Sequence, residues 1–306
     1  MADELKIGVI GLDNSHCVAF THLLNKADDA NHVAGGRVCC AWPGGGSDFK
    51  LSFSRIEGFT KKLHEEYGVE ILDSPEEVAR RSDLVLMTAV DARQHREFYE
   101  RIAPFHRPTF IDKPLATSVA DAAAMLQTAR KSAAPLMSCS ALRYADEFQA
   151  LLTGDAAWGS IVGCDVFGPM AEEEALPGLF WYGVHCVEMV VAAMGAGCRK
   201  LRVMKEEGFD LVSMQWDAKR SAVFRGLREA HGQFGVVLHR QRGARFADLT
   251  NVRRPYYAGL LEAVLRSLPQ GRSDVPEEQM LEVVAIMEAA NQSRRNGQET
   301  TVSAGR

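Results

Sequence analysis

The sequence predicts an α/β fold of two domains, a parallel-sheet domain followed by an α+β domain with a large, mostly antiparallel, open sheet. Two patterns indicate this. In the first half, short continuous apolar runs alternate with amphipathic stretches, as in parallel sheets that are buried on both faces. In the second half, strand-like segments follow one another with little helix between them, which favours hairpins. We place the domains at residues 1–140 and 141–306.

The elements of the first half alternate between strand and helix. The predicted strands are Lys6–Gly11, Arg37–Trp42, Val69–Leu72, Asp83–Thr88, Pro108–Lys113 and Pro135–Ser140. The predicted helices between them include Phe59–Tyr67, Pro75–Arg80 and the alanine-rich Val119–Ser132.

The second half begins with a helix near Ala145–Leu152 and ends with helices near Tyr256–Leu268 and Pro276–Arg294. A further helix near Trp181–Met194 ends at glycines that suit a C-cap. The predicted strands are Ser160–Phe167, Lys200–Lys205, Leu211–Trp216, Ser221–Arg225, Gly235–His239 and Arg245–Leu249. Because a broad sheet with one uncovered face tends to bury that face in an oligomer, we expect a homodimer or homotetramer.

Composition excludes several classes of protein. With 306 residues, 46% of them hydrophobic, the chain can bury a substantial core, and two domains are expected. The net charge is −5 and lysines and arginines are scattered, which argues against a nucleic-acid partner. No apolar run has the length of a membrane span, so no membrane partner is expected. The acidic stretch Met1–Glu4 is unlike a secretory signal.

The cysteines indicate a reducing compartment. There are seven, and none forms a C-x-x-C pair or a zinc-ligand spacing. Most lie within apolar strands or helices, as reduced thiols do in cytosolic proteins. We therefore expect a cytoplasmic protein without a metal. The cysteines are Cys17, Cys39, Cys40, Cys139, Cys164, Cys186 and Cys198.

A glycine loop follows the first strand, in the context that a Rossmann dinucleotide fingerprint requires. It reads Gly11-Leu12-Asp13-Asn14-Ser15-His16, so that Asp13 and His16 occupy the second and third glycine positions. Asp13 could bring a carboxylate toward a pyrophosphate, or it could cap the next helix while Ser15 and backbone amides bind phosphate. An ordinary strand–turn–helix is also compatible. The expected cofactor is NAD or NADP.

The end of the second strand leaves the choice of cofactor open. A ribose-binding acid would be expected there, but the chain enters Gly44-Gly45-Gly46-Ser47-Asp48. Asp48 could reach the ribose, or Ser47 and Arg55 could meet a 2′-phosphate. A flexible glycine loop without a ligand is equally compatible.

A lysine stands at the end of the fifth strand, in Thr109-Phe110-Ile111-Asp112-Lys113-Pro114. Pro114 holds Lys113 in extended geometry at the carboxyl edge of the sheet, where ligands bind in open α/β folds. Lys113 is therefore a charge anchor or a proton-transfer group, unless it is a solvated lysine at a strand end.

These features, with Asp91 and His95 after the fourth strand and Gly183-Val184-His185 on a helix, resemble the Gfo/Idh/MocA family of nicotinamide-dependent sugar and polyol oxidoreductases. The resemblance spans nearly the whole chain. It implies that Lys113, in the family's [DE]-K-P motif, lies beside nicotinamide and substrate. It also implies that His185 contacts substrate hydroxyls.

Two departures suggest a divergent branch. The family usually carries an aspartate four residues before the histidine as a proton-relay partner, and here that position is Trp181. The usual T-P-x-x-x-H loop reads Val90-Asp91-Ala92-Arg93-Gln94-His95, which keeps only the histidine. Tryptophan cannot carry a proton, although it can stack on a sugar face.

The resemblance implies a role for each candidate residue. His185 would be the acid–base group, because its ordinary pKa lies near neutrality, while Lys113 polarises the reacting oxygen or shares the proton. The expected substrate contacts are Arg143, Tyr144, Trp181, Tyr182 and His185, although the aromatics could be core residues and Arg143 an interdomain ion pair. The expected cofactor contacts are Gly11, Asp13, Asn14, Ser15, His16, Asp48, Asp91, His95 and Lys113.

The expected function is an NAD(P)-dependent oxidation or reduction at a hydroxyl of a small molecule, a sugar or polyol derivative. One alternative keeps a tightly bound nicotinamide for a redox-neutral elimination or glycoside cleavage. The other is a ligand-binding relative that has lost turnover. Asp13 and Trp181 favour this last alternative, whereas the pair Lys113 and His185 argues against it.

Overall fold

The computed structural model describes residues 4–46, 48–154, 156–229 and 231–304. These form two compact units. The first comprises the chain up to residue 116 together with 120–139 and 257–277, and the second comprises 117–119, 140–256 and the chain from 278 onward. Ser47, which was considered for a 2′-phosphate, lies outside the described residues.

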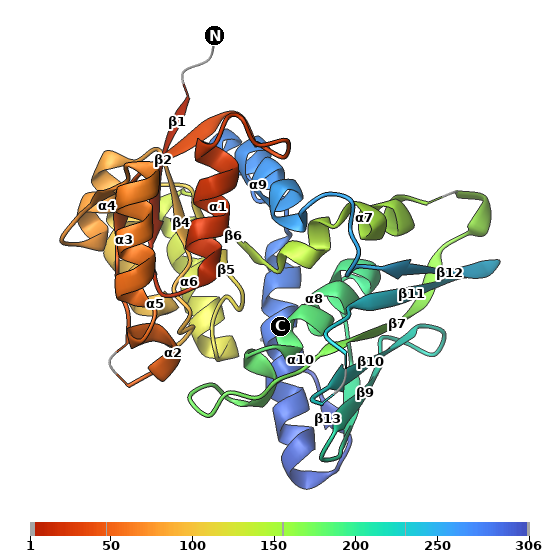
Figure 1. Ribbon diagram of the computed structural model, residues 1–306. Coiled ribbons are helices and arrows are strands. Elements are labelled where there is room, and N and C mark those ends of the chain that lie inside the picture. Colours follow the sequence, from red (N-terminus) through yellow and green to blue (C-terminus); the bar gives the residue numbers. More distant parts are fainter. Residues whose placement is uncertain (1–3, 47, 155, 230, 305–306) are drawn as a thin grey trace. The chain divides into compact units, whose positions relative to one another are not determined.

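The first unit is built on a parallel sheet of six strands in the order β3-β2-β1-β4-β5-β6 (Figure 1). The chain crosses from β1 to either side, which is the strand order of a Rossmann domain. The four residues of β4 are apolar and buried, as expected for a strand covered on both faces. The strands are β1 Leu5–Ile10, β2 Gly36–Trp42, β3 Glu70–Ile71, β4 Leu84–Met87, β5 Thr109–Asp112 and β6 Leu136–Cys139.

Helices separate these strands along the chain. They are α1 Ser15–Asn25, α2 Lys50–Phe53, α3 Ile56–Tyr67, α4 Pro75–Arg81, α5 His95–Ile102 and α6 Val119–Ser132. Helix α5 was not predicted, because its eight residues carry only a short apolar pattern.

Helix α9, Tyr256–Ser267, groups with the first unit, although the expected division assigned it to the second domain. Packing explains the grouping. The ring of Tyr257 lies 5.5 Å from that of Phe20 on α1, and Leu265 approaches the glycine pair Gly35 and Gly36 before β2. Contacts so distant in sequence leave no local pattern.

The second unit contains a sheet in the order β12-β11-β7-β10-β9-β8-β13, whose neighbours are antiparallel except for β7 and β10 (Figure 1). Its strands are β7 Ile161–Pro169, β8 Lys200–Lys205, β9 Phe209–Gln215, β10 Ser221–Leu227, β11 Gly235–Arg240, β12 Gly243–Asp248 and β13 Thr300–Thr301. Its helices are α7 Asp146–Thr153, α8 Gly183–Met194 and α10 Glu277–Asn296.

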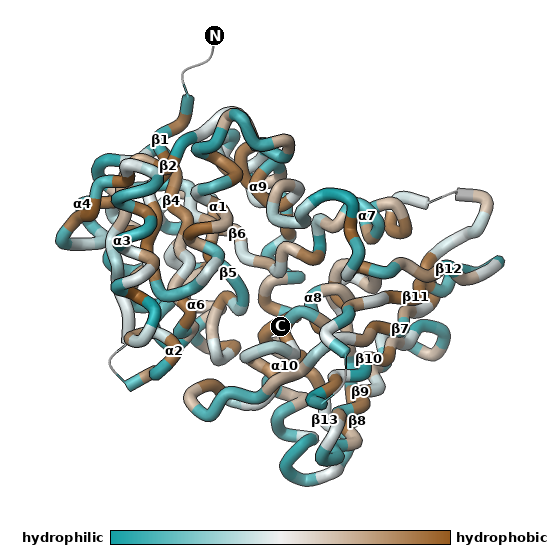
Figure 2. Tube along the Cα trace, viewed as in Figure 1, coloured by the Kyte–Doolittle hydropathy of each residue, from teal (hydrophilic) through white to brown (hydrophobic). Residues whose placement is uncertain are grey.

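The two faces of this sheet differ. Alternate residues such as Val166, Val212 and Phe224 are buried on the face against which α8 packs. On the other face, Met204 and Phe246 are 55% and 56% exposed. The strands carry much of the hydrophobic colour in Figure 2.

The structure confirms the predicted fold class: a parallel Rossmann-like sheet followed by a mostly antiparallel sheet. One helix begins later than predicted. The helix was expected to start at Trp181, but α8 begins at Gly183. A short 3-10 turn, Gly178–Phe180, precedes it. The positive φ of Gly178, 48°, belongs to this turn.

Candidate functional site

The glycine loop turns at Gly11, directly after β1. Its φ is +89°, and a Cβ there would lie 2.4 Å from the main-chain nitrogen of Ala89. Only glycine fits, because both the left-handed conformation and the close approach of Ala89, just after β4, exclude a side chain. The backbone of the loop is thus set as a dinucleotide fingerprint requires.

Asp13 points into the protein. It is fully buried, accepts the N–H of Val90 at 2.9 Å and accepts the hydroxyl of Ser52 at 2.6 Å. Burial raises the pKa of Asp13, which these hydrogen bonds counteract. Ser52 also accepts the N–H of Gly46 at 2.9 Å, so Asp13 fastens the loop after β2 to the loop after β1. The carboxylate therefore neither caps α1 nor faces outward toward a pyrophosphate.

Asn14 caps helix α1 instead. Its side-chain oxygen accepts the N–H of His16 at 3.3 Å, and its amide donates to Asp112 at 3.2 Å. Ser15, the first helical residue, is exposed. The exposed start of this helix, at the positive end of its dipole, has the character of a phosphate site.

His16 joins three segments of the first unit. Its Nδ1 lies 2.7 Å from Asp112, and its Nε2 lies 2.9 Å from the hydroxyl of Tyr257 on α9. Asp112 also accepts the main-chain N–H of Lys113. Burial alone would raise the pKa of Asp112, but the charges of His16 and Lys113 outweigh burial and hold it well below its usual range. The half-buried Lys113 thus follows a fixed carboxylate.

Asp91 and Asp48 are linked through Arg93, a residue that the sequence did not single out. The guanidinium of Arg93 donates twice to the buried Asp91, each at 2.8 Å, and once to the exposed Asp48 at 3.2 Å. The hydrogen bond to Asp91 is the largest cause that raises the pKa of Arg93. A fixed cation and a carboxylate therefore stand side by side near the end of β2, where a ribose would lie.

His95 is fully buried, and both of its ring nitrogens face main-chain oxygens. Nδ1 lies 2.9 Å from the carbonyl of Pro114, and Nε2 lies 2.9 Å from that of Ala89. Its contacts thus tie the loop after β4 to the chain that follows Lys113. They suit a residue that positions this loop.

In the second unit, the ring of His185 lies against Ser140. The serine hydroxyl is 2.7 Å from Nδ1. Ser140 directly follows β6, and His185 is the third residue of α8. The rings of Tyr182 and Phe234 each lie 5.5 Å from His185. The imidazole of His185 is thus held beside a serine hydroxyl and two aromatic rings.

Arg143 forms a buried ion pair with Glu188, at 2.7 Å, and donates to Gln279 at 2.9 Å. Burial raises the pKa of Glu188, an effect that Arg143 counteracts. Both partners belong to the second unit. This pair suits a structural role, because each charge is neutralised by the other.

The remaining expected substrate residues lie near this histidine in the sequence. Trp181 and Tyr182 are half-buried, with ring centroids 5.8 Å apart. Tyr144 ends the short 3-10 helix that Ser140 caps.

Sequence reasoning missed Ser52, Arg93, Ser140 and Tyr257. Only Ser140 carried a usable signal, since it ends the sixth predicted strand at the carboxyl edge of the sheet. The others are recruited through contacts between segments far apart in sequence.

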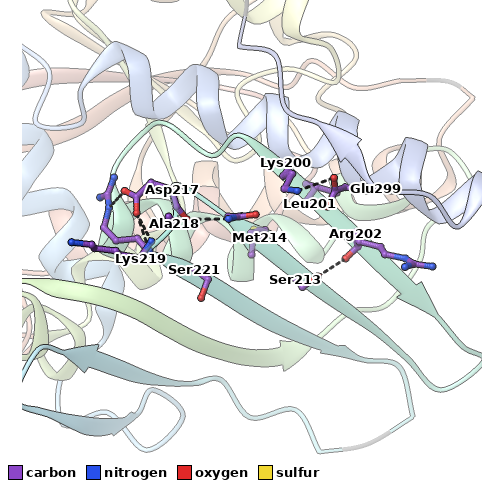
Figure 3. Close-up of a pocket in the computed structure, with 12 residues that line it drawn as sticks. Lys200, Leu201, Arg202, Ser213, Met214, Asp217, Ala218, Lys219, Ser221 and Glu299 are labelled. Carbon is purple, nitrogen blue, oxygen red and sulfur yellow. Dashed lines mark hydrogen bonds and ion pairs between the residues drawn. The ribbon is translucent and has the colours of Figure 1, made fainter.

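A separate pocket lies over β8, β9 and β10 of the second unit (Figure 3). Arg202, Ser213 and Lys219 line it. Its lining contains none of the residues discussed above. Within the described residues, no group of three or more His, Cys, Asp or Glu side chains could hold a metal ion.

The first unit is a Rossmann sheet with polar groups at its glycine loop and strand ends, and an open-sheet unit follows it. This arrangement is typical of dinucleotide-dependent enzymes. The sequence profile of the Gfo/Idh/MocA family, described as "Oxidoreductase family, NAD-binding Rossmann fold", matches residues 5–139. The N-terminal domain thus matches the NAD-binding domain of this oxidoreductase family, which confirms over these residues the resemblance seen in the sequence.

Solved structures agree on the fold. Scyllo-inositol dehydrogenase from Lactobacillus casei matches with a TM-score of 0.80 and 13% identity, over 98% of each chain. Myo-inositol 2-dehydrogenase from Lactobacillus plantarum matches with a TM-score of 0.79 and 15% identity, over 98% of this chain and 100% of that chain. An oxidoreductase from Agrobacterium radiobacter, solved with NAD+, L-tartaric acid and magnesium, matches with a TM-score of 0.75 and 16% identity. The match covers 98% of this chain and 99% of that chain.

Among curated protein sequences, none matches this chain. Within the part of the chain that the structure describes, no helix has the length and apolar character needed to cross a membrane.

The residues of the first unit fit a nicotinamide dinucleotide. Gly11 supplies the turn, Asp13 is turned inward, and the start of α1 is exposed at Ser15. The two substituted glycine positions therefore leave the loop compatible with a pyrophosphate.

Proposed function

We propose that this protein is an NAD(P)-dependent oxidoreductase that acts on a hydroxyl group, or the corresponding carbonyl, of a sugar or polyol derivative. The observation that carries the proposal is the inward orientation of Asp13, whose carboxylate binds Val90 and Ser52. This orientation removes the electrostatic objection to a pyrophosphate at the loop.

The cofactor would be held by the backbone of Gly11 and by Asn14, Ser15 and His16 at the start of α1. Asp48 and the pair of Asp91 and Arg93 would face the ribose, and an adjacent carboxylate and guanidinium leave both NAD and NADP open. When bound, the nicotinamide would donate or accept the hydride.

Lys113 and His185 would act on the reacting oxygen. Two divisions of labour are open to this pair. Lys113 polarises the oxygen while His185 exchanges the proton, as the family resemblance implies, or the two roles are reversed.

A polyol or sugar is favoured by the half-buried rings of Trp181 and Tyr182, because flat aromatic faces pack against sugar rings. The inositol dehydrogenases with the same fold act on such molecules by name. Tyr144 stays a proposed substrate contact, whereas the ion pair of Arg143 with Glu188 favours a structural role for Arg143.

Titration of the purified, cofactor-free protein with NAD(H) and NADP(H), followed by nicotinamide fluorescence and calorimetry, tests the proposal. We expect micromolar binding, weakened in Lys113→Ala, followed by turnover in a screen of polyols and their ketones. An absence of binding to both cofactors would refute the proposal. Binding without any turnover would favour a ligand-binding relative.

We further propose that the protein forms a homodimer or homotetramer through the uncovered face of its second sheet. Register places Met204 and Phe246 on that face, and the rings of Phe246 and Phe167 stack 6.2 Å apart there. We also keep the cytoplasm as the proposed location, which the seven free thiols support. The mass of the protein in solution tests the oligomer.

A further inference from the structure

Three charged side chains lie together on two neighbouring loops of the first unit. Asp48 belongs to the loop after β2, and Asp91 and Arg93 belong to the loop after β4. The two loops are in close contact, because a Cβ at Gly46 would lie 2.9 Å from Nε2 of Gln94 and 3.3 Å from Oδ2 of Asp91. In Rossmann domains the adenosine ribose lies near the end of the second strand. The three charges therefore bear on which ribose, with a 2′-hydroxyl or a 2′-phosphate, the loops can accept.

Arg93 is the cation of this group, and both carboxylates already bind it. Its Nε and Nη2 donate to the two oxygens of Asp91, each at 2.8 Å, and its main-chain N–H donates to Oδ1 of Asp91 at 3.0 Å. Its Nη2 also donates to Asp48 at 3.2 Å. Because Asp91 is buried, its carboxylate cannot exchange this bidentate partner for water. Two carboxylates and one guanidinium leave the group with a net negative charge.

This charge disfavours a 2′-phosphate, which carries close to two negative charges at neutral pH. To reach Arg93, the phosphate would have to displace Asp48 and lie beside the carboxylate of Asp91. Like charges at that separation repel, and such repulsion is a means of rejecting one of two related ligands. A 2′-hydroxyl meets no such obstacle, since it can donate a hydrogen bond to the exposed carboxylate of Asp48. The arginine at this loop is thus no sign of NADP.

We propose that Asp48 and Asp91 make the protein selective for NAD(H) over NADP(H). Asp48 would accept the ribose hydroxyl, and Asp91 is a positioning residue that keeps Arg93 in an ion pair and unavailable to a 2′-phosphate. The inference rests on the function proposed above and narrows the cofactor that it leaves open. Asp91 stands at the proline position of the T-P-x-x-x-H loop, so part of the selectivity comes from a departure after the fourth strand.

Arg55 is the rival cation, since the sequence offered it for a 2′-phosphate. It is exposed at the N-cap of α3. Among the described residues, no hydrogen bond or ion pair joins it to any of the three side chains above. If Arg55 bound a 2′-phosphate, the affinity for NADPH would depend on Arg55 and would not respond to Asp91. The two assignments can therefore be separated by substitution.

Calorimetric titration of the purified, cofactor-free protein with NADH and with NADPH tests the proposal. The wild type should bind NADH roughly tenfold or more tightly than NADPH, the size of one charge contact near solvent. Asp48→Asn should weaken NADH and tighten NADPH, so that the ratio of the two affinities falls. Asp91→Asn should tighten NADPH because it frees Arg93, and the double variant Asp91→Asn/Arg93→Gln should lose that gain. Asp28→Asn, at an exposed position of the same unit, is the matched control and should leave the ratio unchanged.

A wild type that binds NADPH as tightly as NADH, or more tightly, would overturn the proposal. A ratio unchanged in Asp48→Asn would overturn it too, and a loss of NADPH binding in Arg55→Ala alone would assign the 2′-phosphate to Arg55. The wild type and Asp48→Asn decide even where the buried Asp91→Asn variant fails to fold. A protein that binds both nucleotides without this preference keeps the proposed function and loses only the selectivity. A protein that binds neither nucleotide loses both.

Discussion

At the scale of single residues, Asp13 and His16 replace glycines of the dinucleotide fingerprint, and both side chains have internal partners. Asp13 joins Val90 and Ser52, whereas His16 joins Asp112 and Tyr257. A buried polar group is tolerated when its hydrogen bonds are satisfied. These residues have therefore become part of the scaffold of the loop.

Restoring the fingerprint glycine should harm the protein. Asp13→Gly leaves the buried N–H of Val90 and the hydroxyl of Ser52 without their acceptor, so we expect a loss of about 1–3 kcal/mol in the free energy of unfolding. Affinity for NAD(H) should not improve. Urea denaturation and cofactor titration measure both quantities, with Asp28→Gly as the exposed control. An unchanged stability with tighter binding would contradict the role given to Asp13.

Asp112 should make stability depend on pH. Because its folded pKa is lowered by His16 and Lys113, its contribution is fully present well above the unfolded pKa of about 3.9 and is lost progressively as the pH falls through that value toward the lower folded pKa. Asp112→Asn should be less stable at neutral pH and should lose less stability on acidification. Urea titrations from neutral to acidic pH test this. Asp217→Asn, which removes a partly exposed carboxylate paired with Arg220, should change the slope far less.

Lys113 and His185, which the proposed function assigns to the reacting oxygen, can be compared by substitution. Once a substrate is found, loss of the residue that exchanges the proton should lower kcat by about 10²–10⁴-fold. Loss of a residue that only donates a hydrogen bond should cost roughly tenfold. Steady-state kinetics of Lys113→Met and His185→Gln measure both effects, and an unchanged kcat in either variant would remove that residue from the reaction.

At the scale of elements, two helix caps can be compared, one at the proposed cofactor loop and one away from it. Asn14 caps α1 and also donates to Asp112, whereas Ser74 caps α4 through the N–H of Glu77 and otherwise bonds Glu76 of the same helix. Each alanine substitution should cost about 1 kcal/mol of stability. Only Asn14→Ala should also weaken NAD(H) binding, since it disturbs the loop and the carboxylate before Lys113. Thermal unfolding and titration of both variants test this, and equal binding in the two would argue against a cofactor site at α1.

The same scale shows what local sequence can predict. Strands β1, β4 and β5 and the residues Gly11 and Lys113 were predictable, because apolar runs, a glycine and a proline act on their immediate neighbours. The helix at His95–Ile102 and the placement of α9 were not, because they depend on packing between distant segments. The inward turn of Asp13 depends on Ser52, 39 residues away. Local pattern thus gives the elements, while the orientation of polar side chains comes from tertiary contacts.

At the scale of the whole molecule, the proposed assembly uses the face of the second sheet opposite α8. Met204 and Phe246 stand on that face with more than half of their surface exposed, on strands β8 and β12 toward opposite sides of the sheet. A charge placed there would be buried without a partner in the proposed oligomer, which is strongly unfavourable.

Phe246→Glu should therefore shift the protein toward monomers. Light scattering coupled to size exclusion gives the mass directly, and we expect the wild-type protein at two or four times the mass of the chain, 33.6 kDa. Phe53→Glu is the matched control, since Phe53 is 52% exposed but lies in the first unit. It should leave the mass unchanged. A monomeric wild-type protein, or equal masses for the wild type and Phe246→Glu, would refute assembly through this sheet.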